Sequence, residues 1–290
     1  MTNEGAPCAG VMPAALHNGA RAYCQSQISY WRRRYDELSK AGRNQTPNDK
    51  AWAYTDDAKN IFPRHGVLTA ILHEVERFIP ADFANSTQAR ELILLAGQVA
   101  EDTFSKDDDP ISRAASANER DAFCRYISTA DFAELQAAPQ LPFRRVLGRA
   151  EHVARHIEFC RKWGKWYGGG VQSAPAESKA VTLHEQVMHD PPAYAMLRDT
   201  LLNRHGVGRI FELREFDEGY ELLAENASFT YNGAEGFWTS GDMSWMVYAS
   251  HESSITFGGE CLIQHMRERL GSFDHWLYKG WDLKDYGNPE

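Results

Sequence analysis

The hydrophobic residues of this chain change their spacing once, and that change restricts the folds open to it. Up to about residue 167, apolar residues recur at intervals of three or four, which is typical of amphipathic helices. From Arg209 onward, short runs rich in aromatic and β-branched residues alternate with glycine-containing turns, which is typical of β-hairpins. A helical part followed by a part with a mostly antiparallel sheet predicts the α+β class.

The first part is expected to consist of helices, and the last of them has the clearest pattern. Its apolar residues alternate by four and three, which predicts a buried seam. These seam residues are Val146, Ala150, Val153, Ile157 and Cys160. The helices expected in this part cover roughly residues 14–40, 66–78, 88–104, 118–126, 129–136 and 144–167.

A segment from Gly168 to Ser178, GGGVQSAPAES, has almost no side chain to bury. Such a composition is typical of linkers between domains. We therefore place the boundary there, with a helical domain at residues 1–170 and an α+β domain at residues 171–290. A long surface loop within a single domain is the alternative.

Two hairpins are expected in the second part. The segments 209–216 and 220–231 flank a three-residue connection that ends in glycine, a good hairpin signal. Trp245–Ala249 and Ser254–Phe257 form the second pair, with residues 250–253 as the loop. Short helices near Thr182 and Pro191 and a helix over 260–270 complete this part.

The formal net charge of −9 is unevenly spread along the chain. Residues 1–170 hold 22 Lys/Arg and 21 Asp/Glu, whereas residues 171–290 hold 9 and 19. An acidic surface repels a phosphate backbone and attracts a basic partner. We therefore expect no nucleic-acid binding by the second part and a basic protein as its partner. Acidity that serves only solubility is the alternative.

The signatures of common catalytic and cofactor sites are absent from the sequence. It contains no GxSxG, no GxxxxGK[ST] and no complete dinucleotide-binding glycine motif. His184 and His189 are one residue too far apart for a zinc-binding HExxH motif. His152, His156 and Cys160 lie on one helical edge but span too great a length to bind one ion together. We expect no metal and no cofactor.

One segment near the C-terminus is the best catalytic candidate. In YASHESSITFGGE, His251 and Glu252 could act as an acid/base pair, with Ser250 or a bound water as the nucleophile. Adjacent residues of a strand point to opposite faces, so the pair shares a site only if the turn brings the side chains together. An ordinary polar hairpin turn accounts for the same residues without catalysis, and we favour that interpretation.

Aromatic residues are dense in the second part and suggest a binding surface. Tryptophan is enriched at interface hot spots, but aromatic residues are also ordinary core residues of a sheet, and we favour the core for most of them. The binding candidates are Trp238, Asp242, Trp245, Trp276 and Trp281.

The composition and the failed motif matches favour a non-catalytic binding or regulatory protein that engages a protein partner. The alternative is a hydrolase or transferase that uses His251 and Glu252 in a pocket between the two domains. The sequence lacks a signal peptide and an apolar run long enough to span a bilayer, so we expect a soluble, cytoplasmic protein. The substrate, partner and oligomeric state are not specified by the sequence.

Overall fold

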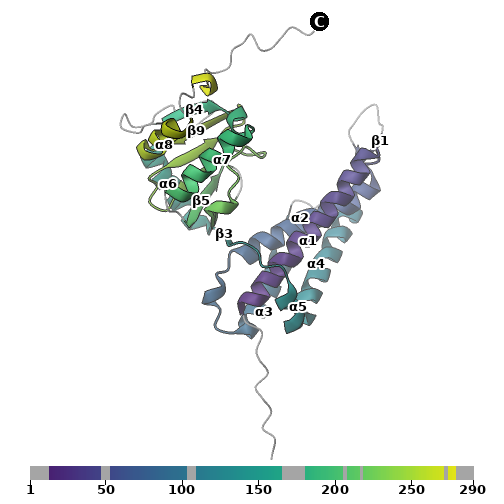
Figure 1. Cartoon of the computed structure of the whole chain (residues 1–290). Coiled ribbons are helices and arrows are strands. Elements are labelled where there is room, and N and C mark those ends of the chain that lie inside the picture. The colour runs from purple at the N-terminus through teal and green to yellow at the C-terminus, as the bar shows by residue number, and fades with distance from the viewer. Residues whose placement is uncertain are drawn as a thin grey trace, which may run out of the picture. The chain divides into compact units, whose positions relative to one another are not determined.

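The computed structural model describes residues 13–46, 53–102, 109–164, 180–204, 208–215, 218–270 and 274–278. The chain divides into two compact units, Met1–Leu141 and Pro142–Glu290. The first is mainly helical and the second contains an antiparallel sheet, so the chain is of the α+β class (Figure 1). Within these ranges, none of the helices is both long and apolar enough to span a membrane.

The first unit is a helical bundle with one continuous core. The buried residues of this core come from all of its main helices and include Leu16, Ile71 and Phe123. The elements are α1 (Pro13–Lys40), the two-residue strands β1 (Gln45–Thr46) and β2 (Ala53–Tyr54), α2 (Asp56–Glu76), the 3-10 turn η1 (Pro80–Asp82), α3 (Ser86–Val99), α4 (Pro110–Thr129) and α5 (Phe132–Ala137).

Side-chain caps set the starts of these helices. Thr55, Asn85, Asp109 and Asp131 each accept a hydrogen bond from a backbone N–H of the first turn of their helix. Such caps satisfy donors that the helix itself leaves unpaired. Helices α2 and α4 therefore begin well before the residues at which apolar spacing becomes regular.

The second unit is built on a seven-stranded antiparallel sheet of order β3-β6-β5-β7-β8-β9-β4. Both hairpins expected from the sequence are confirmed, since β5 pairs with β6 and β8 pairs with β9. The strands are β3 (Arg144–Val146), β4 (Ala180–His184), β5 (Arg209–Arg214), β6 (Tyr220–Leu223), β7 (Gly236–Ser240), β8 (Met246–Ala249) and β9 (Ser254–Gly258).

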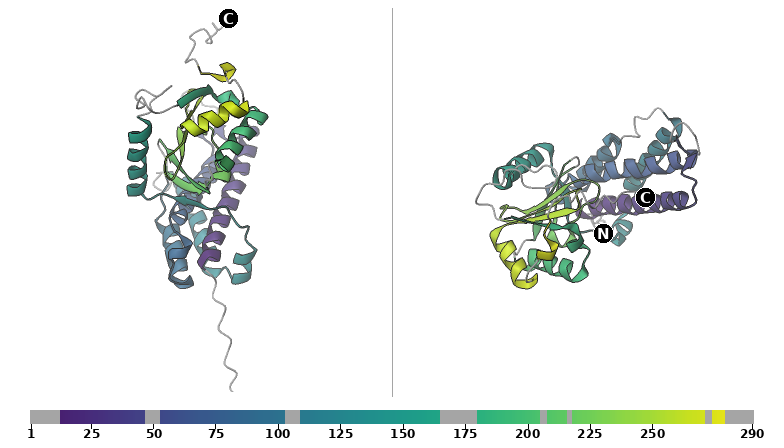
Figure 2. Two further views of the ribbon diagram at one scale, coloured as in Figure 1. Left: turned by 60° about the vertical axis from the view of Figure 1, so that its left-hand side comes forward. Right: turned by 90° about the horizontal axis from the view of Figure 1, so that it is seen from above.

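Helices cover both faces of this sheet. On one face, α7 (Pro191–Asp199) and α8 (Glu260–Leu270) pack on a core that includes Trp238 and Val247. On the other, α6 (Arg149–Trp163) packs on a core that includes Phe237 and Tyr248. The three layers are visible in Figure 2, with α6 in teal on one side and α7 and α8 in green and yellow on the other. The short turns are η3 (Glu185–Met188), η4 (Thr200–Arg204), η5 (Ala224–Asn226) and η6 (Asp274–Trp276).

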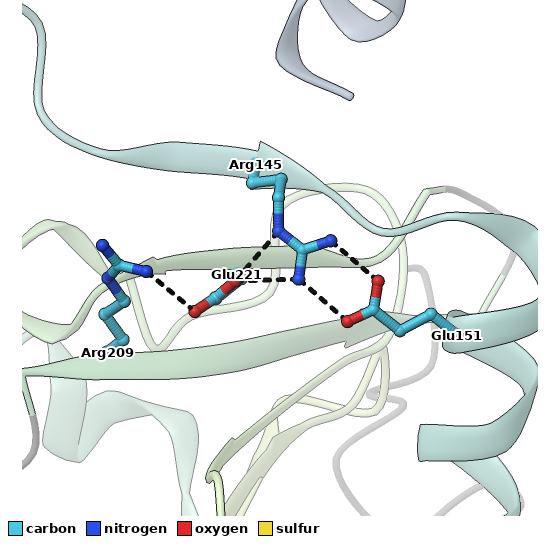
Figure 3. A network of polar contacts seen from close by, with 4 residues as sticks. All are labelled: Arg145, Glu151, Arg209 and Glu221. Atoms are coloured by element: carbon cyan, nitrogen blue, oxygen red, sulfur yellow. Dashed lines mark hydrogen bonds and ion pairs between the residues drawn. The ribbon is translucent and has the colours of Figure 1, made fainter. Parts of the chain in front are cut away.

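The boundary between the units differs from the one expected at residues 170 and 171. Strand β3 pairs with β6, and Arg145 of β3 binds Glu151 of α6 through two hydrogen bonds of 2.7 and 2.8 Å. The same guanidinium also donates to Glu221 of β6, which binds Arg209 (Figure 3). These contacts place β3 and α6 in the second unit. The linker expected at Gly168–Ser178 lies outside the described residues.

With the boundary at Leu141, the difference in net charge between the two parts of the chain disappears. With the division at Leu141, the first unit holds 15 Lys/Arg and 19 Asp/Glu, and the second holds 16 and 21. The net charges are therefore −4 and −5. Basic residues of β3 and α6 and of the segment after α6 now belong to the second unit, so it has no special excess of acid.

The buried seam expected along α6 is wrong. Val153 and Ile157 are 51% and 53% exposed, whereas Phe159 and Trp163 are buried against the sheet. Two large aromatic side chains remove more apolar area from water than the aliphatic stripe would, and they determine which side of the helix faces the core.

Candidate functional site

Four polar side chains converge at one end of the sheet. Glu235 immediately precedes β7, and Ser250 and His251 immediately follow β8. Because Gly236 pairs with Ala249 in this antiparallel ladder, the end of β8 lies beside the start of β7. Tyr248 reaches the same place from β8.

Glu235 is the centre of this cluster, and its side chain is only 7% exposed. Its Oε2 accepts a hydrogen bond of 2.7 Å from the Tyr248 hydroxyl. Its Oε1 accepts from His251 Nδ1 at 2.6 Å and from the Ser250 hydroxyl at 3.3 Å. A buried carboxylate is tolerated when both of its oxygens are engaged in this way.

The carboxylate also alters the titration of its neighbours. Burial, followed by the hydrogen bond to Glu235, raises the pKa of Tyr248 far above its usual value, so this side chain stays a neutral donor. Burial and the nearby Glu235 charge also raise the pKa of Glu215, whose backbone N–H donates to the Glu235 carbonyl at 3.1 Å.

His251 is the exposed member of the cluster. Its side chain is 57% exposed, while its Nδ1 is held by the buried carboxylate. When Nδ1 donates to a carboxylate, the neutral imidazole carries its lone pair on Nε2. The arrangement can therefore accept a proton at Nε2 and stabilise the resulting positive charge through Glu235.

The segment around His251 is also a tight hairpin turn, as the second interpretation of the sequence expects. Ser250 N–H donates to the Ser254 carbonyl at 3.0 Å, and Ser250 Oγ accepts from Glu252 N–H at 3.1 Å. Ser253 takes a left-handed conformation with φ of 57°. The turn and the polar cluster therefore coexist, because the turn directs His251 toward Glu235.

In the structure the His251 imidazole binds Glu235, and an acid/base role for Glu252 stays a prediction. Within the described part of the chain, the His251 imidazole binds Glu235, and the contact that Glu252 makes in the turn is through its backbone N–H. Ser250 is fully buried and its hydroxyl binds Glu235, so it is not placed to attack a substrate.

Asp242 lies at the opposite end of the sheet, in the turn between β7 and β8. It accepts hydrogen bonds from the Ser240 hydroxyl at 2.6 Å and from Ser244 N–H at 3.0 Å. The Ser240 hydrogen bond is the main reason that the pKa of Asp242 is lowered to about 2. Its contacts are those of a turn-closing residue, and a binding role for it stays a prediction.

The tryptophan candidates have different locations. Trp238 and Trp245 are 0% and 1% exposed and belong to the core, as the sequence analysis expects for most of the aromatic residues. Their surface is not accessible to a partner in this fold. Trp276 is partly buried against the same core, and Trp281 lies outside the described residues.

The histidines of α6 lie beside each other. The rings of His152 and His156 are 6.4 Å apart, and Cys160 Sγ lies 3.6 Å from His156 Nδ1. Burial lowers the pKa of His156, and the neighbouring His152 lowers it further. In the ranges that the structure covers, no three His, Cys, Asp or Glu side chains are grouped to hold a metal ion.

Glu235 was not identified from the sequence because β7 was not identified. Every residue of Gly236–Ser240 is buried, so this strand has no alternation of polar and apolar residues. The signal that could have found Glu235 is the antiparallel pairing itself. A strand at 236–240 paired with Trp245–Ala249 places the residue before it beside Ser250.

Comparisons of the chain with models of protein families, with curated proteins and with solved structures each return no match.

Proposed function

We propose that the second unit carries an acid–base site of a hydrolase, with His251 as the general base and Glu235 as the residue that orients it. The supporting observation is the 2.6 Å hydrogen bond between His251 Nδ1 and the buried Glu235 carboxylate. A histidine held at one nitrogen and exposed at the other is the arrangement that general-base chemistry requires.

In this proposal, Nε2 of His251 takes a proton from a water molecule as that water attacks the substrate. The imidazolium that forms is stabilised by Glu235, and it then returns the proton to the leaving group. Tyr248 and Ser250 keep Glu235 in place by donating to its two oxygens. A transferase differs only in that a substrate hydroxyl replaces the water.

The expectation of a non-catalytic binding protein has less support. It depended on an acidic second domain, and the charge excess disappears with the division at Leu141. It also depended on exposed aromatic residues, and Trp238 and Trp245 are buried.

The test is a screen with chromogenic p-nitrophenyl esters and phosphate esters. For any substrate that the purified chain hydrolyses, we expect His251→Gln to lower kcat/KM by about 100-fold, because a positioned general base contributes at least that much. Glu235→Gln should lower kcat as well, since an amide does not stabilise the imidazolium.

His189→Gln is the matched control, because His189 is an exposed histidine of the same unit. Exposed imidazoles hydrolyse activated esters unspecifically, and this variant measures that background. The proposal fails if no probe is turned over, or if the His251 and His189 variants lose the same small fraction of activity while both retain the native circular-dichroism spectrum.

A further inference from the structure

The helical unit contains an apolar cavity near the start of α2 and α4. It has a volume of about 140 Å³. Its lining residues come from α1, β2, α2 and the N-terminal end of α4, and are Tyr35, Tyr54, Ala58, Lys59, Phe62, Pro63, Asp109 and Ser112. An apolar cavity of about 150 Å³ is large enough for a benzene-sized molecule.

Aromatic side chains form much of the wall. The rings of Tyr35 and Phe62 are 5.4 Å apart and tilted by 57°. Phe62 and Tyr54 are 44% and 58% exposed, which is unusual for side chains of this size. A ring inserted among them would remove apolar surface of both partners from water, and ring pairs at such distances attract one another further.

One side of the cavity carries an ion pair. Lys59 Nζ lies 2.7 Å from Asp109 Oδ2, and the two side chains are 34% and 22% exposed. Asp109 Oδ1 accepts from the N–H groups of Ile111 and Ser112 as the cap of α4. The hydrogen bond from Lys59, followed by that from Ser112, lowers the pKa of Asp109, so the carboxyl group stays charged at neutral pH.

This pair determines which polar group a ligand can carry. A carboxylate is attracted by Lys59 but repelled by Asp109. An ammonium group is attracted by Asp109 but repelled by Lys59. An uncharged amide has a carbonyl that accepts from an ammonium and an N–H that donates to a carboxylate. Of these three groups, the uncharged one is the best match to the pair.

We propose that this cavity binds an uncharged, single-ring aromatic compound that carries an amide or hydroxyl group. The ring would lie against Tyr35 and Phe62, with the polar group toward Lys59 and Asp109. This site belongs to the helical unit and is independent of the acid–base site proposed for the second unit.

The test compares three probes with the same ring: benzamide, benzoate and benzylammonium. Binding is followed through the backbone amide NMR signals of the ¹⁵N-labelled full chain. We expect benzamide to bind with a Kd of about 1 mM, as is usual for so small a ligand, and to shift the signals of Tyr35, Ala58 and Phe62. The two charged probes should bind about 10-fold more weakly.

Variants of the ion pair should change the order of the probes. Asp109→Asn keeps the helix cap, because asparagine caps as well as aspartate, and it should make benzoate the tightest of the three. Lys59→Gln should favour benzylammonium. The matched control is Lys40→Gln, because Lys40 is an exposed lysine in the last turn of α1. This variant should leave the order in which the three probes bind unchanged.

The proposal is overturned if the three probes bind equally to the wild-type chain, because the cavity would then select only for an apolar ring. It is also overturned if no probe shifts the signals of the lining residues, or if the ion-pair variants leave the order of the probes unchanged.

Discussion

Replacing Glu76 by alanine is expected to lower the free energy of unfolding of the helical unit by about 3 to 5 kcal/mol. Glu76 of α2 is fully buried, and it binds Arg21 of α1, whose side chain is 6% exposed, at 3.0 Å. Removing the carboxylate takes the Glu76 charge and its hydrogen bond away from a guanidinium that stays buried. Breaking a buried ion pair costs much more than breaking an exposed one.

Glu74→Ala is the matched control on the same helix. Glu74 pairs with Arg77 at 3.2 Å, but both side chains are about one third exposed. Its removal should cost at most about 0.5 kcal/mol. The double variant Arg21→Met with Glu76→Leu should recover most of the loss, because apolar side chains need no counter-ion. The free energy of unfolding of each of the three variants is measured by urea denaturation, followed through the NMR signals of α1 and α2. Equal decreases in this free energy for Glu74→Ala and Glu76→Ala would contradict the prediction.

Acidification is expected to destabilise the same unit through His17, by about 3 kcal/mol between neutral pH and pH 4. His17 is 5% exposed and binds the Val75 carbonyl through Nε2 at 3.0 Å. Burial, together with the charge of Arg21, lowers its pKa from 6.5 to about 4 despite that hydrogen bond. The pKa is therefore lower in the folded state than in the unfolded state.

The direction in which stability changes with pH follows from the protons that the folded and unfolded chains bind. Between pH 6.5 and 4 the unfolded chain binds a proton at His17 and the folded chain does not, so stability is greatest above pH 6.5 and falls as the pH decreases toward 4. The variant His17→Gln has no titrating group there and should show a shallower decline. The measurement is the difference in unfolding free energy between the two proteins at several pH values, and a difference independent of pH would refute the role of His17.

The secondary structure was predictable where one local pattern determined it. The hairpins β5–β6 and β8–β9 follow from β-prone runs separated by short polar turns. Strands β3 and β4 were not predicted because the sequence of each also fits the start of a helix. Arg144–Val146 was assigned to the start of α6, and Thr182 has capping-box spacing with Glu185.

The candidate site was predictable only in part, because it depends on pairing between distant segments. His251 was identified from its residue type, as an imidazole in a polar turn that could take part in acid/base chemistry. Its partner Glu235 is 16 positions away and is brought to it by the register of β7 and β8. No local pattern specifies such a register when both faces of a strand are buried.

The central claim is that Glu235 holds His251 with Nδ1–H directed at the carboxylate and Nε2 facing solvent. The most direct measurement is the long-range ¹H–¹⁵N NMR spectrum of the neutral His251 imidazole, with the exposed His189 as internal reference. The account predicts a proton on Nδ1 and an unprotonated Nε2. A neutral ring protonated on Nε2, or a ring with the averaged signals of a freely rotating side chain, would contradict it.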